Sequence, residues 1–291
     1  MASDIMRVKK DLKTVGSKIR LVLCDLDGTL LNSQKEISSG NMAAIKEANA
    51  LGVNVTICSG RVAPMLYFYA KKLSLDVPFI SSNGGAISSP LTHKALHQKP
   101  MPMNEVRTLL ELCANLGLDY CALSEDGGFF SRDGHCIDRF EQYNRIATKE
   151  GFKTMPLDFF DGGHANALQK PSCNKMLIYR SSDLTPIEDY LKTRASLTYT
   201  FSDDLVMDIF ASGIDKGYGL RELARVMGIE CEEICAFGDY LNDIPMFREA
   251  GLSVAMENAC AEAKEEADIV TASNDDDGVA LAIREYILNT R

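Results

Sequence analysis

The sequence lacks the features that mark membrane-embedded, secreted or disulfide-stapled proteins. No apolar run approaches the roughly 20 residues of a membrane span, and the first residues have no apolar centre of a secretory signal. There is no C-x-x-C motif, and the nine cysteines are an odd number scattered along the chain. We therefore expect reduced, mostly buried thiols in a cytoplasmic protein.

An excess of basic residues is also missing. Asp and Glu number 41 against 31 Lys and Arg, which gives a formal net charge of −10. Such a chain has no general attraction to nucleic acid or to anionic lipid, so we expect neither as a partner. Hydrophobic residues make up 46% of the 291 residues and charged residues 25%, the balance of an ordinary globular protein. An anionic substrate would need a local positive site.

Buried strands alternate with amphipathic helices in the first part of the chain. We expect strands at 19–24, 53–58 and from 78, with helices at 38–51 and 62–73. Short apolar strands that alternate with helices predict βαβ units and a parallel sheet. Residues 1–18 are polar, and we expect them to form a frayed extension.

The pattern changes in the middle of the chain. Between about 88 and 196, helices at 105–116 and 185–194 mix with short strands such as 176–179 and with hairpin-type turns. The α/β pattern then returns, with strands at 206–210, 233–237, 252–255 and 269–270 and helices at 217–227, 242–250 and 279–288. We predict a doubly wound, Rossmann-like α/β core (19–87 and 197–291) interrupted by an inserted α+β domain (88–196).

The strongest chemical signal is Asp25-Leu26-Asp27-Gly28-Thr29, directly after the first expected strand. Ligands of open α/β sheets bind outside the carboxyl ends of the strands. Two carboxylates two residues apart repel one another there unless a cation lies between them. The other reading is a pair of loop aspartates that cap a turn, but a chance match to D-x-D-G-T at a given position is only about six in a million.

Three further segments add groups to the same edge of the sheet. Ser59-Gly60-Arg61 offers a hydroxyl and a glycine amide to an anion, although alone it is most often an ordinary turn. Lys216 precedes a helix and by itself would be read as a surface lysine. Asp239 and Asp243 follow the expected strand at 233–237. Together with the first two aspartates, these groups form the combination expected for metal-assisted phosphoryl transfer.

In this order the four segments resemble the haloacid dehalogenase superfamily, and the insertion resembles that of its Cof-type phosphatases with a class IIB (C2B) cap. The likeness covers 19–288 and includes the segments 82–85 and 274–280. It implies that Asp25 is a nucleophile that becomes phosphorylated, and that Asp27 is the general acid and base. It also implies a Mg²⁺ site made by the Asp25 carboxylate, the Asp27 backbone carbonyl and Asp239, with Asp243 supporting it from behind.

The resemblance also implies how the substrate is held. The residues expected to contact the phosphoryl group or the substrate are Ser59, Gly60, Lys216, Asn242 and, as a weaker candidate, Arg61. The segments 126–132 and 170–175 of the cap are candidates for facing the core. Expected substrates are small phosphorylated metabolites such as sugar phosphates, pyridoxal phosphate or flavin mononucleotide. The alternatives are a sugar phosphomutase of the same superfamily and a non-catalytic protein that binds phosphorylated ligands. We expect a monomer or a weak homodimer.

Overall fold

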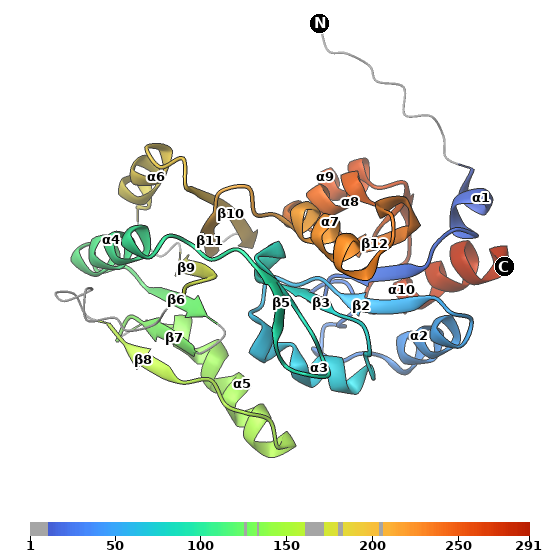
Figure 1. Cartoon of the computed structure of the whole chain (residues 1–291), viewed down its shortest axis with the longest axis horizontal. Coiled ribbons are helices and arrows are strands. Elements are labelled where there is room, and N and C mark those ends of the chain that lie inside the picture. The colour runs from blue at the N-terminus through green and yellow to red at the C-terminus, as the bar shows by residue number, and fades with distance from the viewer. Residues whose placement is uncertain (1–10, 125–126, 133, 161–171, 180–182, 204–205) are drawn as a thin grey trace, which may run out of the picture.

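The computed structural model shows two layers joined side by side (Figure 1). The structure describes residues 11–124, 127–132, 134–160, 172–179, 183–203 and 206–291. One layer is a five-stranded sheet in the order β14-β13-β12-β1-β2, in which every pairing is parallel. Its strands are β1 (Leu21–Cys24), β2 (Asn54–Ile57), β12 (Ile234–Gly238), β13 (Leu252–Ala255) and β14 (Ile269–Val270). The predicted parallel α/β core is confirmed.

Helices cover both faces of this sheet because its central strands are apolar on both sides. In β1, Val22 and Cys24 join the apolar cluster beneath α2 (Ser39–Ala50), α3 (Tyr67–Lys72) and α10 (Gly278–Ala282). Leu21 and Leu23 of the same strand join the cluster beneath α7 (Lys216–Met227) and α8 (Ile244–Glu249). The two-residue period of a strand places alternate side chains on opposite faces. Other helical segments of the core include α9 (Ala261–Glu266) and the short segments η1 (Ala63–Met65), η4 (Cys231–Glu233), η5 (Leu241–Asp243), η6 (Ile283–Ile287) and η7 (Leu288–Thr290).

Residues 11–18, which we expected to be frayed, contain a docked helix. In α1 (Leu12–Gly16) the Asp11 side chain accepts a hydrogen bond from the Lys13 backbone N–H and caps the first turn. Leu12 and Val15 pack against the core cluster. The expectation failed because the two apolar residues in this polar segment lie three apart and so share one helix face. Residues 1–10 lie outside the described part.

A small antiparallel sheet links the two layers. Its strands are β3 (Phe79–Ser81), β4 (Ala86–Ser88) and β5 (Ala95–Gln98). An isolated parallel bridge between Cys58 and Ile80 connects β3 to the end of β2, so β3 is not paired along its length with the core sheet. The third strand of the sequence prediction therefore leaves the core sheet, and this small sheet runs past the expected boundary at residue 87.

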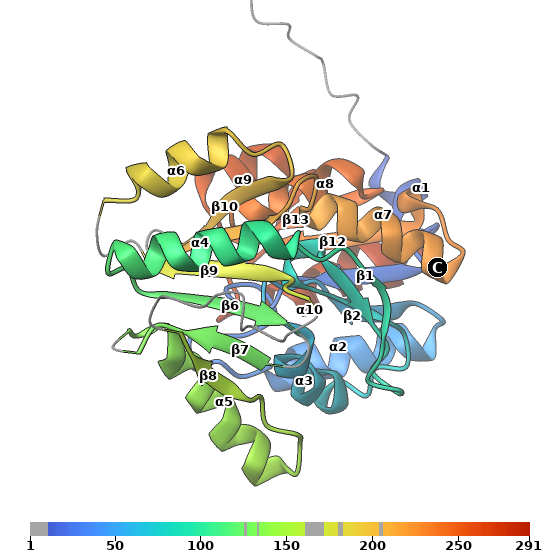
Figure 2. The ribbon, with the colours of Figure 1, turned by 60° about the vertical axis from the view of Figure 1, so that its left-hand side comes forward.

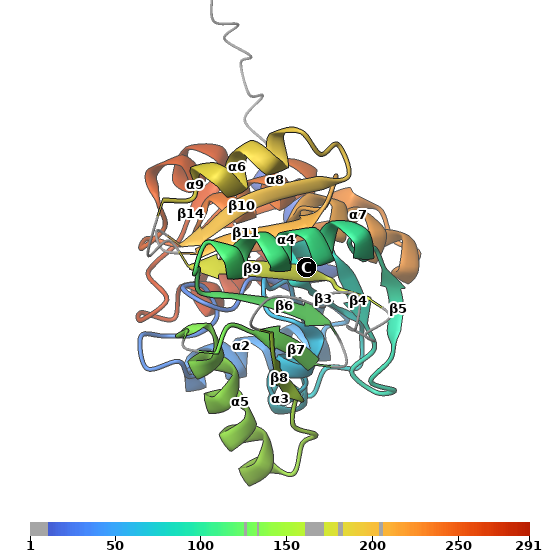
Figure 3. The ribbon, with the colours of Figure 1, turned by 90° about the vertical axis from the view of Figure 1, so that its left-hand side faces the viewer.

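The second layer is a six-stranded sheet in the order β10-β11-β9-β6-β7-β8, which is antiparallel except where β7 meets β8. We call this layer the cap. Figures 2 and 3 show α4 and α6 on the face of this sheet that points away from the core. On the other face, Val62 and Met65 of the core join the apolar cluster made with α5. The elements are α4 (Met103–Asn115), β6 (Tyr120–Ser124), β7 (Gly127–Phe130), α5 (Cys136–Glu150), β8 (Leu157–Phe159), β9 (Lys175–Tyr179), α6 (Thr185–Lys192), β10 (Leu197–Asp203) and β11 (Val206–Ala211).

Two features of the cap differ from the sequence prediction. Strands β10 and β11 pair with β9 and belong to the cap sheet, so the expected boundary at residue 196 falls too early. Every residue of β11 is buried, as in a strand of the parallel core, and burial alone does not show which sheet it joins. The sequence prediction also missed α5. Within the described part of the chain, no helix combines the length and apolar character needed to cross a bilayer.

Candidate active site

The predicted acidic residues meet at the carboxyl end of the core sheet. Asp25 directly follows β1, and Asp239 directly follows β12, the parallel neighbour of β1. Carboxylate oxygens of Asp25, Asp239 and Asp243 all lie within 4.8 Å of one another. Asp25 is 7% exposed and Asp243 is 1% exposed, so water screens their charges poorly. This cluster is the centre of the candidate site.

Lys216 supplies a buried cation to this cluster. The Asp215 side chain caps α7, so Lys216 is the first residue of that helix, and it is only 1% exposed. Its Nζ lies 2.6 Å from Asp25 Oδ1 and 2.5 Å from Asp243 Oδ1. Burial lowers the pKa of Lys216, but Asp243 and Asp25 outweigh burial and the pKa lies well above its usual value. Lys216 is therefore the buried counter-ion of two carboxylates, and the surface-lysine reading is wrong.

Asp243 is held by backbone as well as by Lys216. Its Oδ2 accepts hydrogen bonds from the backbone N–H groups of Asp239 at 2.8 Å and Tyr240 at 3.0 Å. Both of its oxygens thus have partners, one a lysine and the other two amides. Gly238 allows this close approach, because a Cβ at that position would lie 2.4 Å from Asp243 Cγ. This geometry suits a residue that fixes the loop behind the acidic cluster.

Because both oxygens of Asp243 already have partners, Asp239 and Asp25 are the carboxylates of the cluster that can bind a ligand. Asp239 Oδ1 accepts a hydrogen bond of 2.9 Å from the Thr29 hydroxyl. Burial, followed by the charge of Asp243, raises the pKa of Asp239 to about 7. Burial also raises the pKa of Asp25 well above its usual value, although Lys216 opposes the effect. Crowded, buried carboxylates that are costly to ionise are the donor set expected for a hard divalent cation, which relieves their repulsion. The residues present therefore fit such an ion.

Asp27 lies beside this cluster and carries a different set of partners. Arg61 Nε donates to Asp27 Oδ2 and Arg61 Nη2 donates to Asp27 Oδ1, both at 2.9 Å. Lys35 Nζ lies 3.1 Å from Asp27 Oδ1. Burial raises the pKa of Asp27, but Arg61 and then Lys35 outweigh burial, and the pKa falls well below its usual range. Arg61, the weaker candidate for contact with the substrate, is bound to Asp27.

The Ser59-Gly60 turn also lies at this edge of the sheet. Ser59 is 2% exposed, and its Oγ accepts a hydrogen bond of 3.2 Å from the Arg61 backbone N–H. The Ser59 carbonyl accepts a hydrogen bond of 3.0 Å from the Asn83 backbone N–H. A Cβ on Gly60 would lie 3.0 Å from Asn83 Oδ1, so the turn packs closely on that side chain.

Asn83 was not among the predicted site residues, yet it joins three parts of the site. Its Oδ1 accepts a hydrogen bond of 3.2 Å from Asn242 Nδ2, and its Nδ2 donates to Asp208 Oδ2 of the cap at 3.2 Å. Its backbone has a φ of 52°, in the left-handed region that asparagine tolerates better than most residues. The sequence signal was the turn Asn83-Gly84-Gly85, which shows a change of direction without showing its neighbours.

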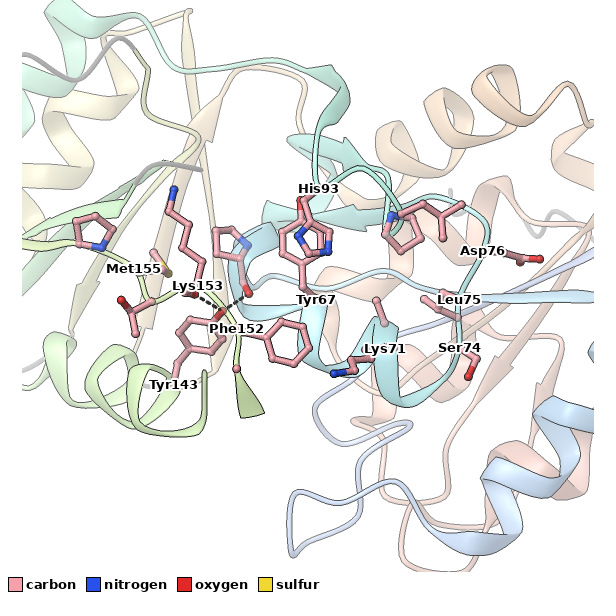
Figure 4. A pocket seen from close by; sticks show the side chains of 17 residues that line it. Tyr67, Lys71, Ser74, Leu75, Asp76, His93, Tyr143, Phe152, Lys153 and Met155 are labelled. Atoms are coloured by element: carbon pink, nitrogen blue, oxygen red, sulfur yellow. Dashed lines mark hydrogen bonds between the residues drawn. The ribbon is translucent and has the colours of Figure 1, made fainter. Parts of the chain in front are cut away.

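Two cavities border the cap and the core. The one of about 190 Å³ adjoins the predicted site and is lined by Asn83, Lys216 and Asn242 of the core and by Thr198, Thr200 and Phe210 of the cap, among others. The one of about 760 Å³ lies between α3 and residues 151–156 (Figure 4), where Tyr67 stacks on His93. No predicted site residue lines this larger cavity. Its size therefore does not make it the catalytic site.

Of the two cap segments expected to face the core, 170–175 does so through Lys175. Its Nζ donates a hydrogen bond of 2.8 Å to the Gly60 carbonyl. Residues 170 and 171 lie outside the described part of the chain, as does residue 126 of the other segment. At the far end of that segment, the Arg132 guanidinium lies 5.2 Å from the centre of the Phe159 ring, within the cap.

The fold and the site together define an enzyme of the phosphoryl-transfer class, with a parallel α/β core and a cap. A family model described as haloacid dehalogenase-like hydrolase matches residues 22–283. The chain therefore belongs to the haloacid dehalogenase-like hydrolases, and it is a phosphoric monoester hydrolase. The resemblance to their Cof-type phosphatases is confirmed.

Named relatives agree with this assignment along nearly their whole length. The chain is 31% identical over 291 aligned positions to the 5-amino-6-(5-phospho-D-ribitylamino)uracil phosphatase YwtE of Bacillus subtilis, with 92% of this chain and 98% of the relative covered. It is 32% identical over 271 positions to the phosphatase YcsE of the same organism and description, with 93% and 96% covered. A crystal structure of a haloacid dehalogenase-like hydrolase from Bacteroides thetaiotaomicron superposes with a TM-score of 0.75 at 28% identity, with 91% and 98% covered.

Proposed function

We propose that the protein hydrolyses phosphomonoesters of small metabolites through a phosphorylated Asp25, with Mg²⁺ as its cofactor. The observation that supports this most strongly is the placement of Lys216 between Asp25 and Asp243, 2.6 Å and 2.5 Å from their oxygens, beside Asp239. A nucleophile needs a nearby cation and a rigid setting to attack a phosphoryl group that is itself anionic. Lys216 supplies the cation, and Asp243, which is hydrogen-bonded to two backbone amides, supplies the rigid setting.

In the first half of the reaction, Asp25 attacks phosphorus in line with the ester oxygen. A bond forms between an Asp25 oxygen and phosphorus while the bond from phosphorus to the ester oxygen breaks. Asp27 gives its proton to the departing oxygen, which leaves as an alcohol. Because Arg61 lowers the pKa of Asp27, substrate binding must loosen that pair before Asp27 carries a proton.

In the second half, water attacks the phosphorus of phosphorylated Asp25. Asp27, now a carboxylate, accepts the proton of this water as the bond between Asp25 and phosphorus breaks. The products are inorganic phosphate and the original Asp25 carboxylate, and Asp27 is again protonated. Two sequential displacements on one phosphorus replace a single difficult attack by water.

The negative charge of the substrate is met by Lys216 and by the turn after β2. The Ser59 hydroxyl and the Gly60 backbone N–H bind phosphoryl oxygens, and Asn242 reaches the same group from the next loop. Asp25, Asp239 and the Asp27 backbone carbonyl would hold Mg²⁺, which neutralises charge on the phosphoryl oxygens when it is bound. Lys216, the Ser59-Gly60 turn and the bound cation would together provide the local positive site that a chain of net charge −10 needs for an anionic substrate.

For the substrate, we propose a small phosphorylated metabolite, with sugar and polyol phosphates as the first class to examine. The cavity beside Asn83 and Lys216 measures about 190 Å³, which favours a small substrate. Two relatives at 31% and 32% identity bear the name of a phosphatase for a phosphorylated ribityl compound. That compound belongs in the substrate panel beside common sugar phosphates, pyridoxal phosphate and flavin mononucleotide.

The test is release of inorganic phosphate from this panel with Mg²⁺, with EDTA, and with an Asp25→Asn variant. Metal-dependent release that disappears in the variant supports the proposal. No release from any compound, with folded protein and added metal, would contradict it. A positional isomer of the substrate in place of free phosphate would identify a mutase.

A further inference from the structure

The cap contributes a buried ion pair that touches the turn where we expect the phosphoryl group to bind. Lys175 begins β9, and Asp208 lies in β11, which pairs with β9. Lys175 Nζ lies 2.9 Å from Asp208 Oδ1, and the two side chains are 5% and 0% exposed. The same Nζ donates to the Gly60 carbonyl at 2.8 Å. A lysine of the cap thus binds the core backbone between Ser59 and Arg61.

Asp208 continues this contact to a second loop of the core. Its Oδ2 accepts a hydrogen bond from Asn83 Nδ2 at 3.2 Å, and Asn83 Oδ1 accepts one from Asn242 Nδ2 at 3.2 Å. A continuous polar chain therefore runs from the Gly60 carbonyl through Lys175 and Asp208 to Asn83 and Asn242. We call these five groups the cap link.

The cap link bears on the geometry of the Ser59 turn through the planarity of the peptide bond. The Gly60 carbonyl and the Arg61 N–H belong to one peptide plane and point in opposite directions. Lys175 binds the carbonyl at one end, and the N–H at the other end donates to Ser59 Oγ at 3.2 Å. The position of Lys175 therefore helps to set the orientation of this plane and of the Ser59 hydroxyl.

Burying a lysine and an aspartate between two domains is costly, since both charges lose their water. The cost is offset only when the cap and the core are docked, because Gly60 and Asn83 of the core supply the remaining partners. Separation of the domains would return these groups to water. The cap link is therefore complete only in the docked arrangement, in which residues of β10 and β11 also line the cavity beside the site.

We propose that Lys175 and Asp208 are positioning residues, which align the Ser59-Gly60 turn and the Asn83–Asn242 pair for phosphoryl transfer when the cap is docked. The inference rests on the proposed function, since it assigns these core groups to the phosphoryl site. If this inference holds, the rate of the chemical step depends on Lys175 and Asp208 of the cap for every substrate, whatever its leaving group. The competing role, recognition of the leaving group by the same pair, gives a different pattern of kinetics.

The main variants are Lys175→Met, Asp208→Asn and the double substitution. The double variant leaves no unpaired buried charge, so it separates a defect of positioning from a failure to fold, and circular dichroism and thermal unfolding verify its structure. Lys175→Arg keeps the charge and the donors. The control is Lys192→Met, which removes a cap lysine from an exposed ion pair with Asp189 that is also 2.9 Å long.

Each variant is assayed with acetyl phosphate, p-nitrophenyl phosphate and the best substrate of the panel. We expect kcat of the double variant to fall by about 10- to 100-fold for all three substrates, because misplacement of about 1 Å costs up to about 100-fold. KM should change far less, Lys175→Arg should recover part of kcat, and Lys192→Met should match the wild type. Unchanged kcat in the double variant, or a loss confined to the KM of one substrate, would overturn the inference.

Affinity for inorganic phosphate, measured by calorimetry with Mg²⁺, separates this inference from the proposed function. If the wild type hydrolyses no phosphomonoester, the proposed function fails and the binding measurement decides the inference. Weaker phosphate binding by the double variant than by Lys192→Met and the wild type then supports positioning. Equal affinity in all three proteins overturns it.

Discussion

Arg61 binds Asp27 through two parallel hydrogen bonds of 2.9 Å, one to each carboxylate oxygen. Paired contacts of this kind between arginine and a carboxylate are strong and hold both side chains in a fixed orientation. The pair joins the loop after β1 to the loop after β2, across 34 residues of sequence. It places a cation beside the proposed general acid, and the acid is therefore a carboxylate until that cation withdraws.

Replacing Arg61 should move the pH dependence of the reaction. Without the guanidinium, the pKa of Asp27 rises, since burial then acts with less opposition. An acid must be protonated to give its proton, so the alkaline decline of kcat/KM should move to higher pH in Arg61→Met, by about one unit or more. Lys35→Met removes a more exposed cation from the same carboxylate and should move it less. An unchanged profile in Arg61→Met would separate Asp27 from the acid role.

Replacing Lys216 should reduce both stability and activity. Lys216→Met leaves the buried carboxylates of Asp25 and Asp243 facing one another without their shared cation. Loss of one partner of a buried ion pair typically costs about 3–5 kcal/mol. Urea unfolding should show a loss of this size, and phosphate release should fall with it. Stability equal to that of the wild type would contradict the assignment of Lys216 as the buried counter-ion.

A methyl group at Gly28 should disturb the metal site directly. Gly28 has a φ of 84°, and a Cβ there would lie 2.3 Å from Asp239 Oδ2. Gly52 has a φ of 79° with no atom within 4 Å of such a Cβ, so Gly52→Ala is a matched control for backbone strain. Backbone strain should cost both variants about 1–2 kcal/mol of stability, and the overlap with Asp239 should add to the loss in Gly28→Ala. Only Gly28→Ala should also need more Mg²⁺ for half-maximal activity, and an equal requirement in both would contradict the placement of Asp239.

Metal affinity should weaken in mild acid. The pKa of Asp239 lies at about 7, raised by burial and by Asp243, and a carboxylate must lose its proton to bind a cation. Below that pH the apparent affinity for Mg²⁺ should fall by up to about tenfold per unit, and above it the affinity should level off. Calorimetric titrations between pH 5.5 and 8.5, in steps of about half a unit, measure this. Affinity that is constant with pH would show that no ligand protonates in this range.

The sequence predicted the parts of the site that follow from strand order. Asp25, Ser59 and Asp239 each come directly after a short apolar run, and parallel strands bring their carboxyl ends to one edge. The helix expected at 217–227 is α7, which begins one residue earlier, at Lys216. These positions depend on local patterns and on one rule of topology, so they were accessible without coordinates.

Contacts that depend on the direction of a side chain could not be predicted from the sequence. Nothing in the local sequence pattern shows that the Arg61 side chain contacts Asp27. Nor does it show that Lys175 pairs with Asp208, which lies in a diagonal position on the neighbouring cap strand. The boundary near residue 196 failed for a related reason. Strand β11 of the cap is buried along its whole length, and its apolar residues suit either sheet.

The proposed phosphorylation of Asp25 is tested most directly by trapping the intermediate. The enzyme is mixed with substrate and Mg²⁺, quenched in acid during turnover and treated with borohydride, which reduces an aspartyl phosphate to homoserine. Mass spectrometry of the peptides then locates the change. The account predicts homoserine at position 25 in the wild type only when substrate is present, and none in Asp25→Asn. Phosphate release by an enzyme whose Asp25 is never converted, or conversion at another aspartate, would contradict it.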